Sequence, residues 1–189
     1  MSGAHRSADG ALVDLSVREF VRSVASAETP VPAGGSVVAL SGSCAAALLA
    51  LVCEVAQHHR PGALSEAHQS AERLQSLLLK LVDEDAAAYQ AFLASRRGTE
   101  DRQAATNRVA ATPLAIGRAC ADLISLSQTV EAETRGPLLG DVRTARHLAQ
   151  AAVRTAVDLA EQNLSLIGDA GARRSLETAI TGLRGALAG

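Results

Sequence analysis

The sequence predicts an all-α protein, an up-and-down bundle of about five long helices followed by a short C-terminal helix. Three observations lead to this prediction. No stretch alternates apolar and polar residues with a period of two, as half-buried strands do. Long segments instead repeat apolar residues every three or four positions, and short breaks that contain glycine or proline separate them. Long helices with short links pack as antiparallel neighbours.

The first helix is predicted over residues 15–27, and the break at residues 28–35 ends it. Its core-facing positions are Leu15, Phe20, Val21 and Val24. Residues 1–13 are expected to form a disordered tail, so that a single helical domain spans residues 14–189.

The second helix is predicted from about Ser36 to His59, where the Arg-Pro-Gly of residues 60–62 stops it. From Val37 to Cys53 it carries no charge for 17 residues, close to the lower limit for a membrane span. Polar and small residues at 41–43 dilute the hydropathy, and no Trp or Tyr flanks either end. No phosphate-loop spacing is present either. We therefore expect a close-packed central helix and no membrane contact.

The third helix, from Leu64 to about Ser95, has the clearest periodicity. Its apolar seam steps alternately by three and four residues, as in a long bundle helix. The seam consists of Leu64, Ala67, Ala71, Leu74, Leu78, Leu81, Asp85, Ala88 and Phe92. One member, Asp85, is a carboxylate.

The fourth helix is predicted to start at Thr99, and Pro113 is expected to kink or split it. The fifth should run from Asp141 to about Ile167, with one polar residue, Asn163, in its seam. That seam consists of Val142, Ala145, Ala149, Ala152, Ala156, Leu159, Asn163 and Leu166. A short helix from about Ala172 to Leu187 is expected to follow it.

Composition excludes several classes of protein. A formal net charge of −2, with acids and bases scattered, gives no basic field for nucleic acid. The three cysteines are odd in number and form no CxxC pair, so they are interpreted as small buried apolar residues rather than as disulfides or zinc ligands. The first residues lack the apolar core of a secretory signal, and we expect a cytoplasmic protein.

Several segments together resemble a known family. PVPAGGSVVALSGSCAAALLALV (30–52) is similar to the opening of the formiminotransferase-cyclodeaminase C-terminal domain and of bacterial methenyltetrahydrofolate cyclohydrolases. The resemblance continues, in the family's order, over roughly residues 15–175. It is carried by LVDEDAAAYQAF (81–92), ATPLAIGRAC (111–120), GDV (140–142) and QNLSLIGD (162–169).

The resemblance implies a five-helix bundle that forms a homodimer, with no bound cofactor and a tetrahydrofolate derivative as substrate. Members of the family close 5-formimino-tetrahydrofolate to 5,10-methenyl-tetrahydrofolate with loss of ammonia, or convert the methenyl form to 10-formyl-tetrahydrofolate. Such a protein would act on small molecules and on neither nucleic acid nor membranes.

Asp85 is the first candidate for catalysis. An unpaired charge in a core seam costs several kcal/mol, so a carboxylate there needs a partner, a shifted pKa or a ligand. It also matches the aspartate of the family's D-x-x-A-F/Y motif, which places Tyr89 at the substrate. Such a carboxylate can exchange a proton or stabilise a cationic folate carbon. The alternative is a solvated acidic cluster at residues 83–85.

Further candidates come from the same resemblance, each with a structural alternative. Asp141 matches a family aspartate but also fits an ordinary N-cap. Gly34, Gly35 and Ser36 match a motif that lets a flat pterin approach backbone amides, or they form a plain helix-entry turn. Asn163 matches the asparagine of the family's I-N-L segment and is a candidate for substrate binding, or it makes a buried interhelical hydrogen bond.

Three departures from the family pattern concern the substrate. Ala33 replaces a glycine, and Arg143 replaces the glycine of D-V-G, where a guanidinium could neutralise Asp141, fill the folate space or bind another anion. The basic residue expected after the second helix falls on His59 or Arg60, which could act in catalysis or simply face the helix C-terminus. The histidines have no metal-ligand spacing, and no metal is assigned.

The sequence thus leads to a folate one-carbon enzyme of the cyclodeaminase or cyclohydrolase type. The catalytic candidates are Asp85, Asp141, His59 and Arg60, and the substrate-binding candidates are Gly34, Gly35, Ser36, Arg143, Asn163 and Tyr89. Two alternatives stay open. One is a relative that closes or opens a C–N ring in another metabolite, and the other is a non-catalytic helical scaffold.

Overall fold

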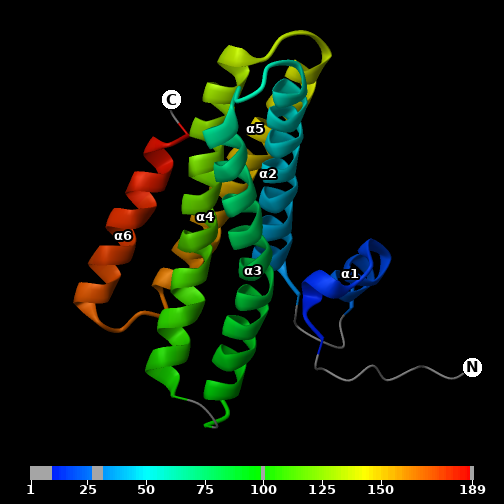
Figure 1. The fold of residues 1–189 in the computed structure, drawn as a ribbon. Helices are drawn as coiled ribbons and strands as arrows, with labels where there is room; N and C mark the ends of the chain where they lie inside the picture. The colour runs from blue at the N-terminus through cyan, green and yellow to red at the C-terminus, as the bar shows by residue number, and fades with distance from the viewer. Residues whose placement is uncertain (1–9, 27–31, 99–100, 188–189) are drawn as a thin grey trace, which may run out of the picture.

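The computed structural model describes residues 10–26, 32–98 and 101–187. Within these residues the chain is all-α, with no strand, so the predicted fold class is confirmed. Four long helices form the bundle, and two short helices and two 3-10 turns complete it (Figure 1). The elements are η1 (Leu12–Asp14), α1 (Val17–Val24), α2 (Gly34–His59), α3 (Ser65–Ser95), α4 (Arg102–Glu133), η2 (Gly136–Leu138), α5 (Leu139–Leu164) and α6 (Ala170–Gly185).

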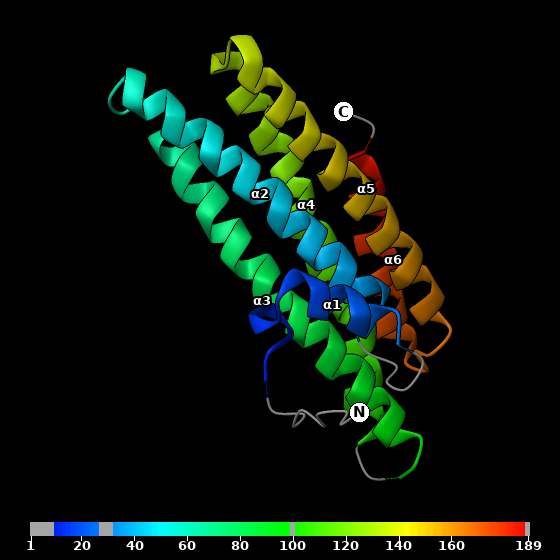
Figure 2. The ribbon, with the colours of Figure 1, turned by 90° about the vertical axis from the view of Figure 1, so that its right-hand side faces the viewer.

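The four long helices run alternately up and down. Each packs on the next, and α2 also packs on α5, which closes the bundle. The lower end of the bundle, its lower half in Figure 1, holds the start of α2 and the final turns of α3, which continue below the start of α2. The upper end holds the end of α2 and the start of α5. Helix α6 lies outside α4 and α5, and α1 crosses in front of the lower part of α2 and α3 (Figure 2).

Helix α2 is the close-packed central helix that the sequence predicts. A Cβ added to Gly42 would lie 2.7 Å from Cys120 Sγ and 3.2 Å from Leu78 Cδ1, so α2, α3 and α4 meet where only glycine fits. Helices α2 and α4 are both long and apolar enough to cross a membrane, but more than half of each apolar stretch, 56% and 61%, is buried inside the bundle. Burial of this kind is ordinary for core helices of a soluble bundle.

The first helix is shorter than predicted. Ser16 and Glu19 form a reciprocal capping box that starts α1 at Val17, and the helix ends at Val24. Phe20 is buried as expected. Val21 and Val24 are 60% and 38% exposed, so the prediction that they face the core is wrong.

Most of the predicted N-terminal tail lies outside the described residues. The last two residues of the predicted tail, Leu12 and Val13, belong to η1. There the Leu12 N–H donates to Asp83 Oδ1 at 2.5 Å, which ties the start of the described chain to α3.

The cysteines divide into two kinds. Cys53 and Cys120 are fully buried, and burial raises the pKa of their thiols to about 11 and about 12. Both are therefore unreactive apolar residues, as predicted. Cys44 instead lies exposed on the outer face of α2, which corrects the prediction for that residue.

Helix α4 is continuous with Pro113 inside it, so of the two predicted outcomes the split is wrong, and the kink stays a prediction. The helix begins after Asp101, whose Oδ1 accepts from the Gln103 and Ala104 N–H groups. Thr99, the predicted start, lies outside the described residues.

The Asn163 side chain replaces a backbone hydrogen bond that Pro113 removes from α4. Proline has no N–H, so the carbonyl four residues earlier, that of Val109, loses its helical partner. The Asn163 Nδ2 donates to this Val109 oxygen at 2.9 Å. The polar residue in the α5 seam therefore closes the hydrogen-bond ladder of α4.

We predict that Pro113 and Asn163 are energetically coupled. Asn163→Leu should lower the free energy of unfolding by about 1–3 kcal/mol, since it leaves the Val109 carbonyl without a partner. In a Pro113→Ala background the N–H of the introduced alanine takes that carbonyl, and the cost of Asn163→Leu should fall markedly. Urea unfolding of the two single variants and the double variant measures this, and equal costs in both backgrounds would contradict the coupling.

Candidate active site

The strongest candidate site lies at the lower end of the bundle, where α3 places Asp85 against the first turn of α2. Ser36 Oγ lies 3.0 Å from Asp85 Oδ2 and 3.0 Å from the Val82 carbonyl oxygen. The backbone N–H of Ser36 also hydrogen bonds to the Asp85 carboxylate. The N-cap residue of α2, Ala33, makes no side-chain cap. A carboxylate from α3 thus takes the place of the missing N-cap of α2.

The two glycines at the start of α2 have different surroundings. A Cβ at Gly35 would lie 2.0 Å from Asp85 Oδ1 and 2.4 Å from its Cγ, so the carboxylate occupies the space that a side chain would need. A Cβ at Gly34 would make only ordinary contacts, at 3.8 Å or more, with Leu159 of α5. There is therefore no room for a Cβ atom at position 35, which must be glycine, whereas position 34 has room for a larger residue.

Burial and hydrogen bonding act on the charge of Asp85 in opposite directions. Desolvation raises the pKa of its carboxyl above the ordinary 3.8, and the side-chain and backbone hydrogen bonds from Ser36 lower it, with desolvation the larger effect. Ser36 itself is fully buried. The arrangement gives a half-buried carboxyl that holds its proton to higher pH than a surface aspartate and that a neighbouring hydroxyl keeps oriented.

Tyr89 and Asn163 also belong to the lower end. Tyr89 lies one turn after Asp85 on α3, 36% exposed, with its ring tilted against Phe92 at a centroid distance of 6.5 Å. Its position is open to a ligand. Asn163 is near the end of α5, and its amide donates to Val109. The interhelical hydrogen bond therefore accounts for Asn163 without a substrate.

His59, Arg60, Asp141 and Arg143 lie at the upper end. Along α2 the rise from Ser36 to His59 is about 35 Å, so one chain does not bring these residues together with Asp85. Arg60 pairs with Glu133 at 3.4 Å. A cavity of about 370 Å³ opens beside it, lined by Val52, Val55, Ala56, His59, Arg60, Ala132, Glu133, Thr134, Arg135 and Leu138.

Asp141 does not cap α5. The helix begins at Leu139 with Leu138 as its N-cap, so the third residue of the helix is Asp141, in the first turn. The N-cap interpretation of Asp141 is therefore wrong, although a carboxylate in the first turn still suits the helix dipole.

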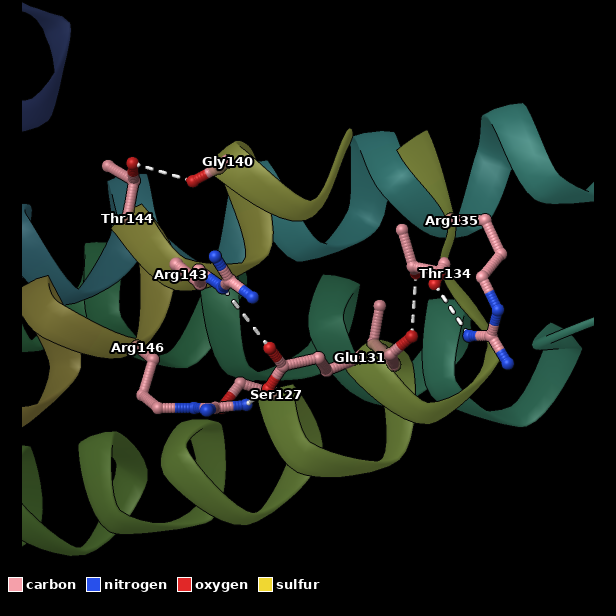
Figure 3. Close-up of polar contacts among 9 residues, drawn as sticks. Ser127, Glu131, Thr134, Arg135, Gly140, Arg143, Thr144 and Arg146 are labelled. Carbon is pink, nitrogen blue, oxygen red and sulfur yellow. Dashed lines mark hydrogen bonds and ion pairs between the residues drawn. The ribbon is translucent and has the colours of Figure 1, made fainter. Parts of the chain in front are cut away.

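Arg143 takes part in a polar cluster between α4 and α5 (Figure 3). Its Nε donates to Glu131 at 3.3 Å, Arg146 forms a second ion pair with the same carboxylate, and Arg146 Nε donates to the buried Ser127 hydroxyl at 2.8 Å. The hydrogen bonds from Arg146 and then Arg143 lower the pKa of Glu131. No local pattern in the sequence pointed to Arg146 or Glu131, because their pairing depends on how α4 and α5 face each other.

Among the residues that the structure describes, no group of three or more His, Cys, Asp or Glu side chains is placed to hold a metal ion. The histidine near the start of α3, His68, lies 3.9 Å from Glu72.

Comparison with models of protein families shows which family the chain belongs to. The profile described as Formiminotransferase-cyclodeaminase matches residues 16–182. The chain belongs to the formiminotransferase-cyclodeaminase family. No curated protein matches it. The family match extends from the capping box of α1 into the last turns of α6, and it includes both the Gly34–Ser36 turn and Asp85. Membership in the formiminotransferase-cyclodeaminase family associates the chain with folate metabolism.

We predict that alanine at position 35 lowers the free energy of unfolding much more than alanine at position 34 does. Gly35→Ala should lower the free energy of unfolding by about 1–3 kcal/mol, because its methyl group must displace the Asp85 carboxylate. Gly34→Ala should change it by less than about 1 kcal/mol. Urea unfolding of the two variants tests this. Equal effects at the two positions would mean that the carboxylate does not occupy the space beside Gly35.

Proposed function

We propose that the protein acts on the one-carbon unit between N5 and N10 of tetrahydrofolate. It would close 5-formimino-tetrahydrofolate with loss of ammonia, or hydrolyse 5,10-methenyl-tetrahydrofolate. The observation that carries the proposal is the Asp85 carboxyl, half-buried at the start of α2 with a raised pKa, in a chain of this family. Both reactions move protons onto and off nitrogen or water at a cationic carbon, which is chemistry for such a carboxyl.

In the closing reaction N10 attacks the formimino carbon and loses its proton, while the departing nitrogen gains one and leaves as ammonia. In the hydrolysis, water adds to the methenyl carbon and loses a proton. The bond from that carbon to N5 then breaks as N5 is protonated, and the hydroxyl on the carbon releases its proton to solvent as it becomes the formyl C=O. Ionised Asp85 accepts the first proton in either case, and its protonated form donates the second. The ionised carboxylate also stabilises the cationic methenyl carbon, which is present before water adds in the hydrolysis and after ammonia leaves in the closure.

The surroundings of Asp85 suit this role. Ser36 fixes the orientation of the carboxylate by hydrogen bonds from its hydroxyl and N–H. Gly34 is exposed and has no side chain, so a flat ring can approach the backbone at the start of α2. Tyr89, one turn from Asp85 on α3, offers a ring on which a substrate can stack.

The alternative of an exchanged substrate loses part of its support. Arg143 suggested a different anion, but its guanidinium pairs with Glu131 at the upper end of the bundle and lies far from Asp85. Of the departures from the family pattern, Ala33 remains beside the candidate site, because it directly precedes Gly34.

We predict that Asp85→Asn abolishes folate turnover and leaves a folded protein. The test mixes the purified protein with 5,10-methenyl-tetrahydrofolate and follows its near-ultraviolet absorbance. Loss of the carboxyl should slow the protein-dependent reaction by about 100-fold or more. Glu84→Gln, at an exposed neighbouring carboxylate, is the matched control and should keep full activity. Absence of any rate above buffer with the unaltered protein would contradict the proposed function and favour the exchanged substrate.

We predict further that Ser36→Ala moves the acidic limb of the pH–rate profile to higher pH. The Ser36 hydrogen bonds stabilise the ionised carboxylate, so removal of the hydroxyl raises the pKa of Asp85 further. The rate that depends on ionised Asp85 then appears at higher pH than in the unaltered protein. Measurement of kcat/KM against pH for both proteins checks the direction, and a shift to lower pH would contradict it.

A further inference from the structure

The Ser36 hydroxyl lies between two acceptors but has a single proton to donate. Its Oγ is 3.0 Å from Asp85 Oδ2 and 3.0 Å from the carbonyl oxygen of Val82. A serine hydroxyl carries one proton and two lone pairs, and its O–H rotates to suit the acceptors around it. It can therefore donate a full hydrogen bond to only one of these oxygens at a time, although both are within reach.

The charge of Asp85 determines which acceptor the hydroxyl prefers. An ionised carboxylate can only accept, and a charge-assisted hydrogen bond to it is stronger than one to a neutral carbonyl. A protonated carboxyl has an O–H of its own, and a proton on Oδ2 can be donated to Ser36 Oγ over the same 3.0 Å. The serine then accepts from Asp85, and its own proton is available to another acceptor.

The Val82 carbonyl is placed to accept that proton. Val82 lies within α3, where the N–H of Ala86 is the helical partner of its carbonyl, and a carbonyl oxygen has a second lone pair. Ser36 and Val82 are both fully buried, and a buried hydroxyl that donates to nothing is unfavourable. The carbonyl therefore allows Ser36 to accept from protonated Asp85 without leaving its own proton unpaired.

The carboxyl itself has little freedom to turn. Its Oδ1 and Cγ lie 2.0 Å and 2.4 Å from the position that a Cβ atom of residue 35 would take, so the carboxyl lies against the backbone of Gly35. The Ser36 N–H also hydrogen bonds to it. Rotation of one hydroxyl is thus the smallest movement that adapts this site to the gain or loss of a proton.

We propose that Ser36 is a positioning residue: its hydroxyl donates to Asp85 while the carboxylate is ionised, and turns to the Val82 carbonyl when Asp85 takes up a proton. In both states Asp85 Oδ2 and Ser36 Oγ share one hydrogen bond, with donor and acceptor exchanged. The carboxyl keeps its orientation while its charge changes. The importance of this exchange for turnover rests on the proposed function, but the exchange itself does not.

Asp85 is the group whose charge governs the exchange. The buried residues of α2, α4 and α5 include no Asp, Glu, His, Lys or Arg, and the buried cysteine thiols stay neutral because burial raises their pKa. On α3, Asp83 accepts a backbone N–H of η1, and Glu84 is exposed. On η1, Asp14 is exposed. In the described part of the chain, no charged side chain other than Asp85 hydrogen bonds to Ser36.

The exchange suits a group that changes charge twice in each turnover. In the proposed reactions Asp85 accepts one proton and donates another, so its carboxyl must hold the same geometry in both charge states. A hydroxyl with one acceptor would support only the ionised form. With two acceptors Ser36 supports both forms, while its stronger bond to the anion still lowers the pKa of Asp85.

Carbon-13 NMR on labelled protein tests the exchange without any substrate. The Cγ resonance of Asp85 reports its protonation, and the carbonyl resonance of Val82 reports the hydrogen bond that this oxygen gains. In a pH titration of the unaltered protein, both resonances should move with the same midpoint. A Val82 resonance that stays constant while Asp85 titrates would show that the hydroxyl does not turn, and would overturn the proposal.

Two variants separate the hydroxyl from the other links between Val82 and Asp85, which lie three residues apart on α3. In Ser36→Ala the Asp85 Cγ should still titrate, with its midpoint at higher pH, while the Val82 carbonyl stays constant. In Asp85→Asn the Val82 carbonyl should also be independent of pH. A Val82 titration that persists in either variant would contradict the proposal, and Asp85→Asn keeps the test decisive if Ser36→Ala does not fold.

Kinetics test the role in turnover. At the plateau of its own pH profile, Ser36→Ala should lower kcat on 5,10-methenyl-tetrahydrofolate by about 10-fold or more, because the protonated carboxyl loses its acceptor and its fixed orientation. Ser41→Ala is the matched control, since it removes a hydroxyl of α2 that donates to the Val37 carbonyl, and it should leave kcat unchanged. An unchanged plateau kcat in Ser36→Ala would contradict the positioning role.

The exchange and the proposed function fail separately. Folate turnover together with a constant Val82 carbonyl would overturn the exchange and leave the proposed function in place. A titrating Val82 carbonyl in a protein without folate turnover would contradict the proposed function, and the exchange would stand.

Discussion

The fold depends on one contact between helices, the Asp85 carboxylate of α3 at the first turn of α2. Helix α2 packs on α3, α4 and α5, yet it begins without a capping side chain of its own. The N–H groups of a first turn need acceptors, and in this protein one comes from the neighbouring helix. The start of α2 and the register of α3 against it are therefore determined by the same interaction.

The same contact determines the charge state of the carboxyl at the candidate site. A carboxylate at the start of a helix is favoured by the helix dipole, while its burial favours the protonated acid. At Asp85 desolvation has the larger effect, so the anion is less stable there than its hydrogen bonds alone would make it. A purely structural cap gains nothing from this balance, whereas an acid–base group depends on it.

The sequence predicted the long helices and most of their buried faces because both follow from local periodicity, whereas the core face of the short α1 was predicted wrongly. The seams of α3 and α5 are buried nearly as expected, although Leu166 lies beyond the end of α5 and is exposed, and Ile167 is buried in its place. Partners across the bundle were not predictable. Nothing local links Pro113 to Asn163, or Glu131 to Arg146, since each pair is brought together only by the packing of α4 on α5. For the same reason the sequence grouped His59 with Asp85, although the length of α2 separates them.

The hydrogen bond from Asn163 to Val109 also links the motions of two helices. Asn163 is in the last turn of α5, and helix ends open more readily than helix centres. When that turn unwinds, the Val109 carbonyl is released to water and α4 loses the contact that closes its backbone at the proline. Proline sites without such a contact bend. The end of α5 is therefore coupled to the backbone of α4 at its proline, at the lower end of the bundle where the start of α2 and Asp85 also lie.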